Sequence, residues 1–268
     1  MIIIGERLNA TKKKVGEAIR SRHAAFIQQE ARAQAAAGAH YLDCNAGRDP
    51  ASEKQDMAWL IQTVRQATDL PLAIDSADPE VQRAGLEVYQ GLPPILNSAT
   101  AESGKMEAVL DLAREHNACL VALALGDAGM PKVEGDREAN IQRIIEAAAE
   151  RGIAPQRIFA DPVVEAVSTG LERPLGRLLL SAIRNIRQAH PCVHISAGIS
   201  NVSFGLPNRR LLNRTLLALA MGAGLDAAIL DPCDEHMMAT LHAAEALLGV
   251  DEACANYIAA SREGKLEV

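Results

Sequence analysis

The chain has 268 residues, of which 49% are hydrophobic, 23% charged and only 3% aromatic. This composition is typical of a globular protein and excludes a largely disordered chain. The formal net charge of −7, from 27 Lys and Arg against 34 Asp and Glu, argues against a nucleic-acid-binding protein.

Short apolar runs alternate along the chain with longer segments rich in Ala, Leu and charged residues. In chain order, the predicted strands are Ile2–Ile4, Tyr41–Cys44, Leu72–Ile74, Pro94–Leu96, Leu120–Leu123, Ile158–Ala160, Val193–Ser196 and Ala227–Leu230. The predicted helices are Ala24–Ala37, Ala51–Ala67, Glu80–Tyr89, Lys105–Glu115, Arg137–Arg151, Leu175–Gln188, Leu211–Met221 and Glu235–Leu248. The strands lack polar alternation, as expected when a parallel sheet is covered on both faces.

Eight strand–helix units predict an α/β protein with the (β/α)8 TIM barrel fold, whose usual length is about 250 residues. An open, doubly wound sheet is the alternative, but it rarely contains eight such even repeats. No linker or low-complexity tract interrupts the pattern. We therefore expect a single domain over residues 1–268, with an extra C-terminal helix at about 252–262.

The N-terminal segment and the cysteines bear on cellular location. The apolar run at the start of the chain is shorter than the core of a secretory signal, which has about 7–15 residues. No uncharged stretch reaches the roughly 20 apolar residues of a membrane span. The five cysteines are scattered and show no Cys-x-x-Cys spacing, which favours free thiols. We expect a cytoplasmic protein with no membrane association.

Polar side chains follow seven of the eight predicted strands. In chain order they are Glu6, Arg7 and Asn9; Asp43 and Asn45; Asp75 and Ser76; Asn97 and Ser98; Asp161; Ser200 and Asn201; and Asp231. A single Asp or Asn in such a place is often only a helix cap or a turn residue. Because the active site of a TIM barrel lies at the carboxyl ends of its strands, so many together predict a cavity with short hydrogen-bonding groups. Such a cavity suits a flat, nitrogen-rich ligand.

The polar residues do not show the spacing of a metal site. We therefore expect no protein-bound metal. His190, Cys192 and His194 form a His-x-Cys-x-His pattern that resembles a soft-metal cluster. These three residues precede or begin the seventh predicted strand, away from the polar strand ends, so a structural role is favoured. No glycine-rich phosphate-binding loop is present.

Several motifs follow one another in order along the chain. They are Gly5-Glu-Arg-Leu-Asn9, Asp43-Cys-Asn-Ala-Gly47, Leu72-Ala-Ile-Asp-Ser76, Asn97-Ser98, Ile158-Phe-Ala-Asp-Pro162, Gly198-Ile-Ser-Asn-Val-Ser203 and the stretch Asn208–Thr215. With these motifs, over about residues 2–262, the chain resembles the pterin-binding methyltransferases. That family includes methyltetrahydrofolate:corrinoid/iron-sulfur protein methyltransferase and the folate domain of cobalamin-dependent methionine synthase.

The resemblance implies roles for individual residues. Asp75, Asn97 and Asp161 match the positions that hydrogen-bond the pterin ring. Carboxylates suit that role because the aminopyrimidinone edge offers paired N–H donors. Asn201 matches the asparagine near N5 of the folate, and we expect it to act in catalysis by stabilising charge that develops at N5.

Further residues are expected around the folate. Asn208 and Arg209 match positions at the substrate cleft. We include Glu6, Asp43, Asn45 and Ser98 among the expected folate-binding side chains. A close family member has Gln directly after the Ser-Asn-Val-Ser run, where this chain has Phe204.

The resemblance also implies an activity. The family moves a methyl group between N5 of methyltetrahydrofolate and the cobalt of a corrinoid, in either direction. The folate is then a substrate, and we expect the cobalamin to come on a separate corrinoid protein, because the barrel uses the whole 268-residue chain. A homodimer is expected on the resemblance alone.

Two alternatives remain open: a condensing enzyme similar to dihydropteroate synthase, and a non-catalytic pterin-binding protein. Dihydropteroate synthase shares the barrel but has a glycine-rich, arginine-containing loop after the second strand and a Lys/Arg pair near the seventh. The segment Asp43–Arg48 matches the first only faintly, and Gly205–Arg209 replaces the second.

Overall fold

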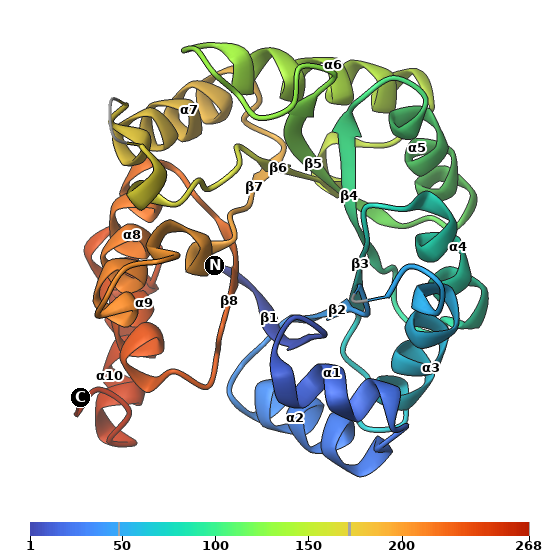
Figure 1. The fold of residues 1–268 in the computed structure, drawn as a ribbon. Helices are drawn as coiled ribbons and strands as arrows, with labels where there is room; N and C mark the ends of the chain where they lie inside the picture. Colours follow the sequence, from blue (N-terminus) through green and yellow to red (C-terminus); the bar gives the residue numbers. More distant parts are fainter. Residues whose placement is uncertain (48, 171–172, 268) are drawn as a thin grey trace.

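The computed structural model describes residues 1–47, 49–170 and 173–267. Eight parallel strands lie in the order β7-β6-β5-β4-β3-β2-β1-β8. They are β1 (Ile2–Asn9), β2 (Tyr41–Asn45), β3 (Leu72–Asp75), β4 (Ile95–Ala101), β5 (Cys119–Gly126), β6 (Ile158–Asp161), β7 (His194–Ile195) and β8 (Ala227–Leu230). Figure 1 shows these strands as a ring with the helices outside it. The TIM barrel predicted from the sequence is confirmed.

Helices alternate with the strands, and two helices rather than one follow β1 and β8. They are α1 (Lys13–Arg20), α2 (Ala24–Ala36), α3 (Glu53–Arg65), α4 (Pro79–Val88), α5 (Lys105–Glu115), α6 (Asp136–Glu150), α7 (Leu175–Ala189), α8 (Arg209–Ala223), α9 (Glu235–Leu247) and α10 (Ala255–Arg262). Short 3-10 turns are η1 (Pro155–Arg157), η2 (Val167–Thr169), η3 (Ile199–Ser203) and η4 (Glu252–Cys254). Each of the eight predicted helices is present with ends within two residues of the prediction. Helix α1 was not predicted, because its short lysine-rich segment buries only Val15, Gly16, Ala18 and Ile19.

The ring closes between β7 and β8 with few hydrogen bonds. A single parallel bridge joins Gly198 to Ile229. The Ile229 N–H donates to the carbonyl of Ala197 at 2.9 Å, and the Asp226 N–H donates to that of Ile195 at 3.3 Å. By comparison, β1 and β8 pair through four consecutive residues.

An apolar floor fills the barrel interior and carries a polar layer above it. The floor consists of Ile4, Ala73, Ile95, Val121, Phe159 and Ala227, each at most 2% exposed. Since side chains alternate along a strand, the next inward residue lies two positions further on. Those residues are Glu6, Asp75, Asn97, Leu123, Asp161 and Ile229, and all of them line one cavity. A second, larger apolar cluster packs between the strands and the helices.

The His-x-Cys-x-His pattern lies at the amino end of β7, as predicted. His194 stacks on Phe159 with ring centroids 4.9 Å apart, and its Nδ1 lies 3.0 Å from Oδ2 of Asp226. Across the described ranges, no group of three or more His, Cys, Asp or Glu side chains could hold a metal ion. No helix in those ranges is long and apolar enough to cross a membrane.

Candidate functional site

A cavity of about 980 Å³ opens at the carboxyl ends of the strands. Of the ten site residues expected from the sequence, eight line it: Glu6, Asp43, Asp75, Asn97, Ser98, Asp161, Asn201 and Arg209. The structure therefore brings together residues as far apart in the chain as Glu6 and Arg209. The other two, Asn45 and Asn208, are not part of the cavity wall.

Two amide–carboxyl pairs organise the wall formed by β2, β3 and β4. Asn97 donates through Nδ2 to Oδ1 of Asp43 at 3.1 Å. Asn45 donates through Nδ2 to Oδ2 of Asp75 at 2.9 Å, while its own Oδ1 accepts the Gly47 N–H at 3.0 Å. Asn45 therefore does not line the cavity but hydrogen-bonds to Asp75, which does.

Burial governs the charge of these carboxyl groups. It raises the pKa of Asp43 well above its ordinary value, and the negative charge of the neighbouring Asp75 raises it further. Burial also raises the pKa of Asp75, although the hydrogen bond from Asn45 opposes that change. Because two neighbouring negative charges repel each other, Asp43 and Asp75 do not both ionise readily, and the pair holds one proton more strongly than an isolated carboxyl group does. A ligand that offers N–H donors favours the ionised form.

Asp161 stands apart from this pair, at the end of β6. Its side chain is buried, and burial raises its pKa to about 7, against the opposing effect of the hydrogen bond from the Val163 N–H. That N–H donates to Oδ1 at 2.8 Å. Val163 and Val164 form the cavity wall beside it. The carboxyl is thus oriented by the backbone that directly follows it.

Asn201 lies on η3, in the segment after β7, opposite Asp75 and Asn97 in the ring of strands. Its backbone carbonyl accepts the Phe204 N–H at 3.1 Å, and its exposed side chain lines the cavity. A Cβ at Gly198 would lie 3.0 Å from the Asn201 Nδ2, tighter than most contacts, so glycine leaves the amide room at the strand end. The amide can present either an acceptor oxygen or a donor nitrogen to a ligand.

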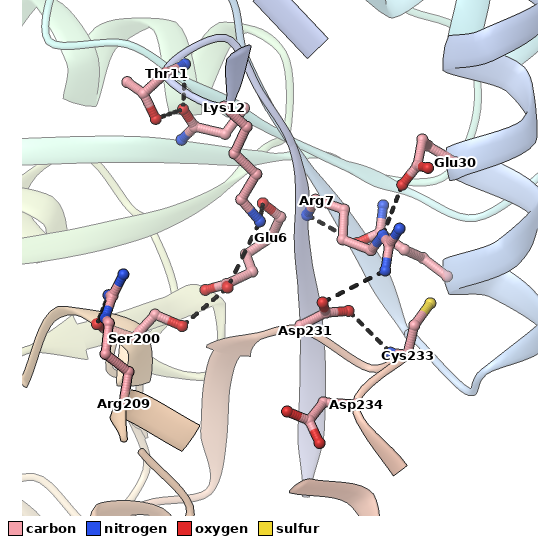
Figure 2. Close-up of polar contacts among 12 residues, drawn as sticks. Glu6, Arg7, Thr11, Lys12, Glu30, Ser200, Arg209, Asp231, Cys233 and Asp234 are labelled. Carbon is pink, nitrogen blue, oxygen red and sulfur yellow. Dashed lines mark hydrogen bonds and ion pairs between the residues drawn. The ribbon is translucent and has the colours of Figure 1, made fainter. Parts of the chain in front are cut away.

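Glu6 joins this segment to β1. Figure 2 shows Ser200 donating to Oε1 of Glu6, at 2.9 Å, with Lys12 on the other side of the carboxylate. The Lys12 Nζ donates to the Glu6 carbonyl at 3.1 Å and lies 3.7 Å from Oε1. Burial raises the pKa of Glu6, and the positive charge of Lys12 opposes this.

Arg7 points to the opposite side of β1 from Glu6. Its guanidinium pairs with Glu30 on α2, at 2.6 Å, and lies 3.5 Å from Oδ2 of Asp231. Figure 2 marks both contacts with dashed lines. Asp231 in turn accepts the Cys233 N–H at 3.0 Å. This network ties the ends of β1 and β8 to helix α2, beside the opening of the cavity.

Arg209, the first residue of α8, supports η3. It donates through Nη2 to the Ser200 carbonyl at 2.8 Å and through Nε to the Ser203 hydroxyl at 3.1 Å. Its guanidinium carbon lies 5.9 Å from the centre of the exposed Phe204 ring. Asn208 precedes the helix with a left-handed φ of 52° and an exposed side chain.

Several wall residues were not predicted. They include Lys12, Thr100, Glu102, Lys105, Leu125, Val163 and Val164. Lys12 immediately precedes the unpredicted helix α1, and Thr100 lies in the part of β4 beyond its predicted end. Arg48, part of the loop compared above with the glycine-rich loop of the synthase, lies outside the described residues.

Comparisons with known proteins agree on one family. The family model described as "Pterin binding enzyme" matches residues 5–231. A methylcorrinoid:tetrahydrofolate methyltransferase from Eubacterium limosum is 38% identical over 268 residues, covering 99% of this chain and 98% of that protein. A methionine synthase from Mycobacterium leprae is 32% identical over 85% of this chain, but the match spans only 20% of that longer protein.

Solved structures with the same fold include two dihydropteroate synthases. The enzyme from Vibrio fischeri superimposes with a TM-score of 0.70 at 17% identity, over 92% of each chain. The enzyme from Xanthomonas albilineans gives a TM-score of 0.69 at 20% identity, over 94% of this chain and 92% of that one. At such identities the likeness concerns the fold alone.

Proposed function

The chain belongs to the pterin-binding enzyme family, and we propose that it is a methyltransferase acting between a methylated corrinoid and tetrahydrofolate. The corrinoid is carried by a separate protein, and the methyl group moves between its cobalt and N5 of the folate. The relative matched over almost its full length supports this activity and favours transfer toward the folate. The reverse direction uses the same site.

The observation that carries the proposal is the placement of four side chains in one cavity. Asp75, Asn97 and Asp161 stand directly above the apolar floor, and Asn201 lies opposite the first two. A pterin head matches this arrangement, because its aminopyrimidinone edge can donate to carboxylates while its flat ring lies against apolar side chains. Bound there, the head leaves the reacting edge of the folate toward Asn201 and the cavity opening.

The chemistry explains the use of an asparagine. In transfer to the folate, the nitrogen N5 forms a bond to the methyl carbon as the carbon–cobalt bond breaks; the cobalt keeps the electron pair and N5 releases its proton to solvent water. In the reverse direction, Co(I) takes the methyl carbon and N5, which keeps the electron pair of the broken bond, takes up a proton from solvent; a hydrogen bond to N5 stabilises the charge that develops before the proton arrives. The Asn201 amide can accept from an N5–H through Oδ1 or donate to the N5 lone pair through Nδ2.

We also propose a cytoplasmic homodimer whose barrel opening receives the corrinoid protein. All five cysteines are free thiols, which fits a reducing compartment. Phe204 is 69% exposed and belongs to the cavity wall, so it offers an apolar contact at the opening. Size-exclusion chromatography with light scattering tests the dimer; a monomeric mass at working concentrations would contradict it.

The activity is tested with purified protein, tetrahydrofolate and methylcobalamin under anaerobic conditions. We expect the Co(I) absorbance spectrum to appear only when both folate and protein are present, and methyltetrahydrofolate to form in equal amount. The reverse assay uses cob(I)alamin and methyltetrahydrofolate. Folate binding without transfer in either direction would leave a non-catalytic pterin-binding protein. Product from a pterin pyrophosphate and p-aminobenzoate would instead indicate a condensing enzyme.

A further inference from the structure

Arg137 is a buried cation close to the cavity but not in its wall. It lies in the first turn of α6, and its side chain is only 4% exposed. Burial of a guanidinium is unfavourable unless its donors are paired, and the positive end of the helix dipole adds to the cost. The partners that offset this cost therefore indicate what the residue does.

Those partners lie in the segment that follows β6. The Nε of Arg137 donates to the carbonyl of Pro162 at 2.7 Å, and its Nη2 donates to Oε1 of Glu165 at 2.6 Å. The other carboxylate oxygen of Glu165 accepts from Arg173 at 3.0 Å. Arg173 also donates to the carbonyls of Pro131 and Lys132, at 3.1 and 3.0 Å. Arg137 thus ties the start of α6 to the segment after β6, and Arg173 ties that same segment to residues 131–132, which precede α6.

The peptide unit between Pro162 and Val163 is held at both ends. Its carbonyl accepts from Arg137, and its N–H donates to Oδ1 of Asp161 at 2.8 Å. Val163 has a φ of 63°, a left-handed conformation that a β-branched residue rarely adopts. Rotation of this peptide would relieve that strain but would break both hydrogen bonds. Arg137 therefore opposes a rotation that would release the Asp161 carboxyl.

We propose that Arg137 is a positioning residue for pterin binding. It anchors the Pro162–Val163 peptide and so fixes the N–H that orients the Asp161 carboxyl in the cavity. This inference rests on the proposed function, since it takes the pterin head as the partner of Asp161. The competing explanation is that Arg137 only stabilises the fold.

The test compares Arg137→Met, which keeps a long side chain but removes all donors, with Arg157→Met. Arg157 also holds backbone carbonyls, those of Ala113 and Ala118, but at the amino ends of the strands. The tetrahydrofolate Kd is measured by calorimetry, the melting temperature by circular dichroism, and kcat and KM by methyl transfer. We expect the Arg137→Met Kd and folate KM to rise tenfold or more, with kcat within about threefold of wild type. Arg157→Met should lower the melting temperature with an unchanged Kd.

Arg137→Lys keeps a donor for the Pro162 carbonyl, so it should recover part of the affinity and provides a folded variant if Arg137→Met does not fold. A double-mutant cycle with Asp161→Ala gives the second readout. If Arg137 acts through Asp161, Arg137→Met should change the Kd less than threefold in the Asp161→Ala background. If Arg137→Met changes the folate Kd equally in both backgrounds, or leaves it at the wild-type value, this inference is overturned but the proposed function is not. A wild-type protein that binds no folate would overturn the proposed function and this inference with it.

Discussion

The Asn45 amide donates a 2.9 Å hydrogen bond to the Asp75 carboxylate, so a residue outside the cavity wall supports one within it. The bond stabilises the ionised form of Asp75 and opposes the rise in pKa that burial causes. Asp75 is therefore oriented for a ligand before one arrives. The two residues should make separable contributions to folate affinity.

Asp75→Asn should raise the folate Kd by roughly 10- to 150-fold, because a charge-assisted hydrogen bond is worth about 1.5–3 kcal/mol. Asn45→Ala should raise it only about 2- to 10-fold, since it removes a neutral donor and leaves the carboxylate in place. Calorimetric titration at pH 8 measures both. Equal losses of affinity, or none in either variant, would contradict the arrangement.

Asn201→Ala should lower the methyl-transfer rate at saturating folate by about 10²–10³-fold, the usual effect of losing one transition-state hydrogen bond. The folate Kd should change much less, because in the proposed arrangement the carboxyl groups across the cavity bind the pterin head. Asn185→Ala is a suitable control: Asn185 lies on the outer helix α7 and donates to Glu138. A wild-type rate in Asn201→Ala would remove this residue from the catalytic step.

Folate affinity should depend on pH near neutrality. The pKa of Asp161 is raised to about 7 by burial, so the carboxyl gains a proton as the pH falls through 7 and then accepts hydrogen bonds less well. We expect the folate Kd to rise between pH 8 and pH 6. In Asp161→Asn the affinity should be weaker at pH 8, by about 1.5–3 kcal/mol, and this part of the pH dependence should vanish. The same pH profile in both proteins would assign the titration to another group.

The same substitution should stabilise the fold at high pH. The folded-state pKa of Asp161 lies above the ordinary 3.8, so the folded protein binds the proton more tightly than the unfolded chain. The free energy of unfolding therefore falls as pH rises from about 4 to about 7 and levels off above that. Asp161→Asn avoids ionisation in the interior, so urea unfolding at pH 8 should show a gain on the order of 2–4 kcal/mol. At pH 5, which lies between the ordinary and the raised pKa, the gain should be less than half of that at pH 8. An equal gain at both pH values would contradict this origin.

Phe204→Ala should raise the KM for the corrinoid protein several-fold and leave the folate Kd unchanged. Phe204 is 69% exposed at the opening, and loss of a well-packed aromatic contact commonly costs more than about 1 kcal/mol at an interface. Leu247→Ala serves as the control, because Leu247 is 88% exposed at the far end of α9. Steady-state kinetics with the corrinoid protein as the varied substrate separates the two variants. A KM that responds equally to both substitutions would place the docking surface elsewhere.

Much of this site could be predicted from the sequence because a parallel barrel brings the ends of all its strands to one rim. Asp75, Asn97 and Asp161 follow apolar strands at the same offset, so the alternation of side chains alone turns them inward above the floor. The same alternation could not predict that Asp43 lines the cavity while Asn45 does not. Both lie on the inward side of β2, but Asn45 bonds to Asp75 instead of lining the cavity.

Other features depend on tertiary contacts that leave no local pattern. Arg137 stands in a charged segment at the start of a helix, where an exposed side chain is the natural expectation; its burial follows from the meeting of α6 with the segment after β6. Lys12 reaches the cavity from a loop before a short helix with too few apolar positions to predict. Asn208, expected at the substrate cleft from its motif, is exposed and lies next to Arg209, outside the cavity wall.

The sparse closure between β7 and β8 makes one side of the barrel less tightly hydrogen-bonded than the rest. Asp43 and Asp75 lie on β2 and β3, which pair through four consecutive residues. Asn201 instead follows the two-residue strand β7, which pairs with β6 through two residues and is linked to β8 by the single Gly198–Ile229 bridge beyond its end. The β2–β3 side of the cavity, where we propose that the pterin head binds, should therefore be stiffer than the β7–β8 side, where we propose that the methyl carrier approaches. Among the strands, backbone amide hydrogens should exchange with solvent fastest at this seam. Movement there, on docking of the proposed corrinoid protein, would disturb the proposed folate contacts least.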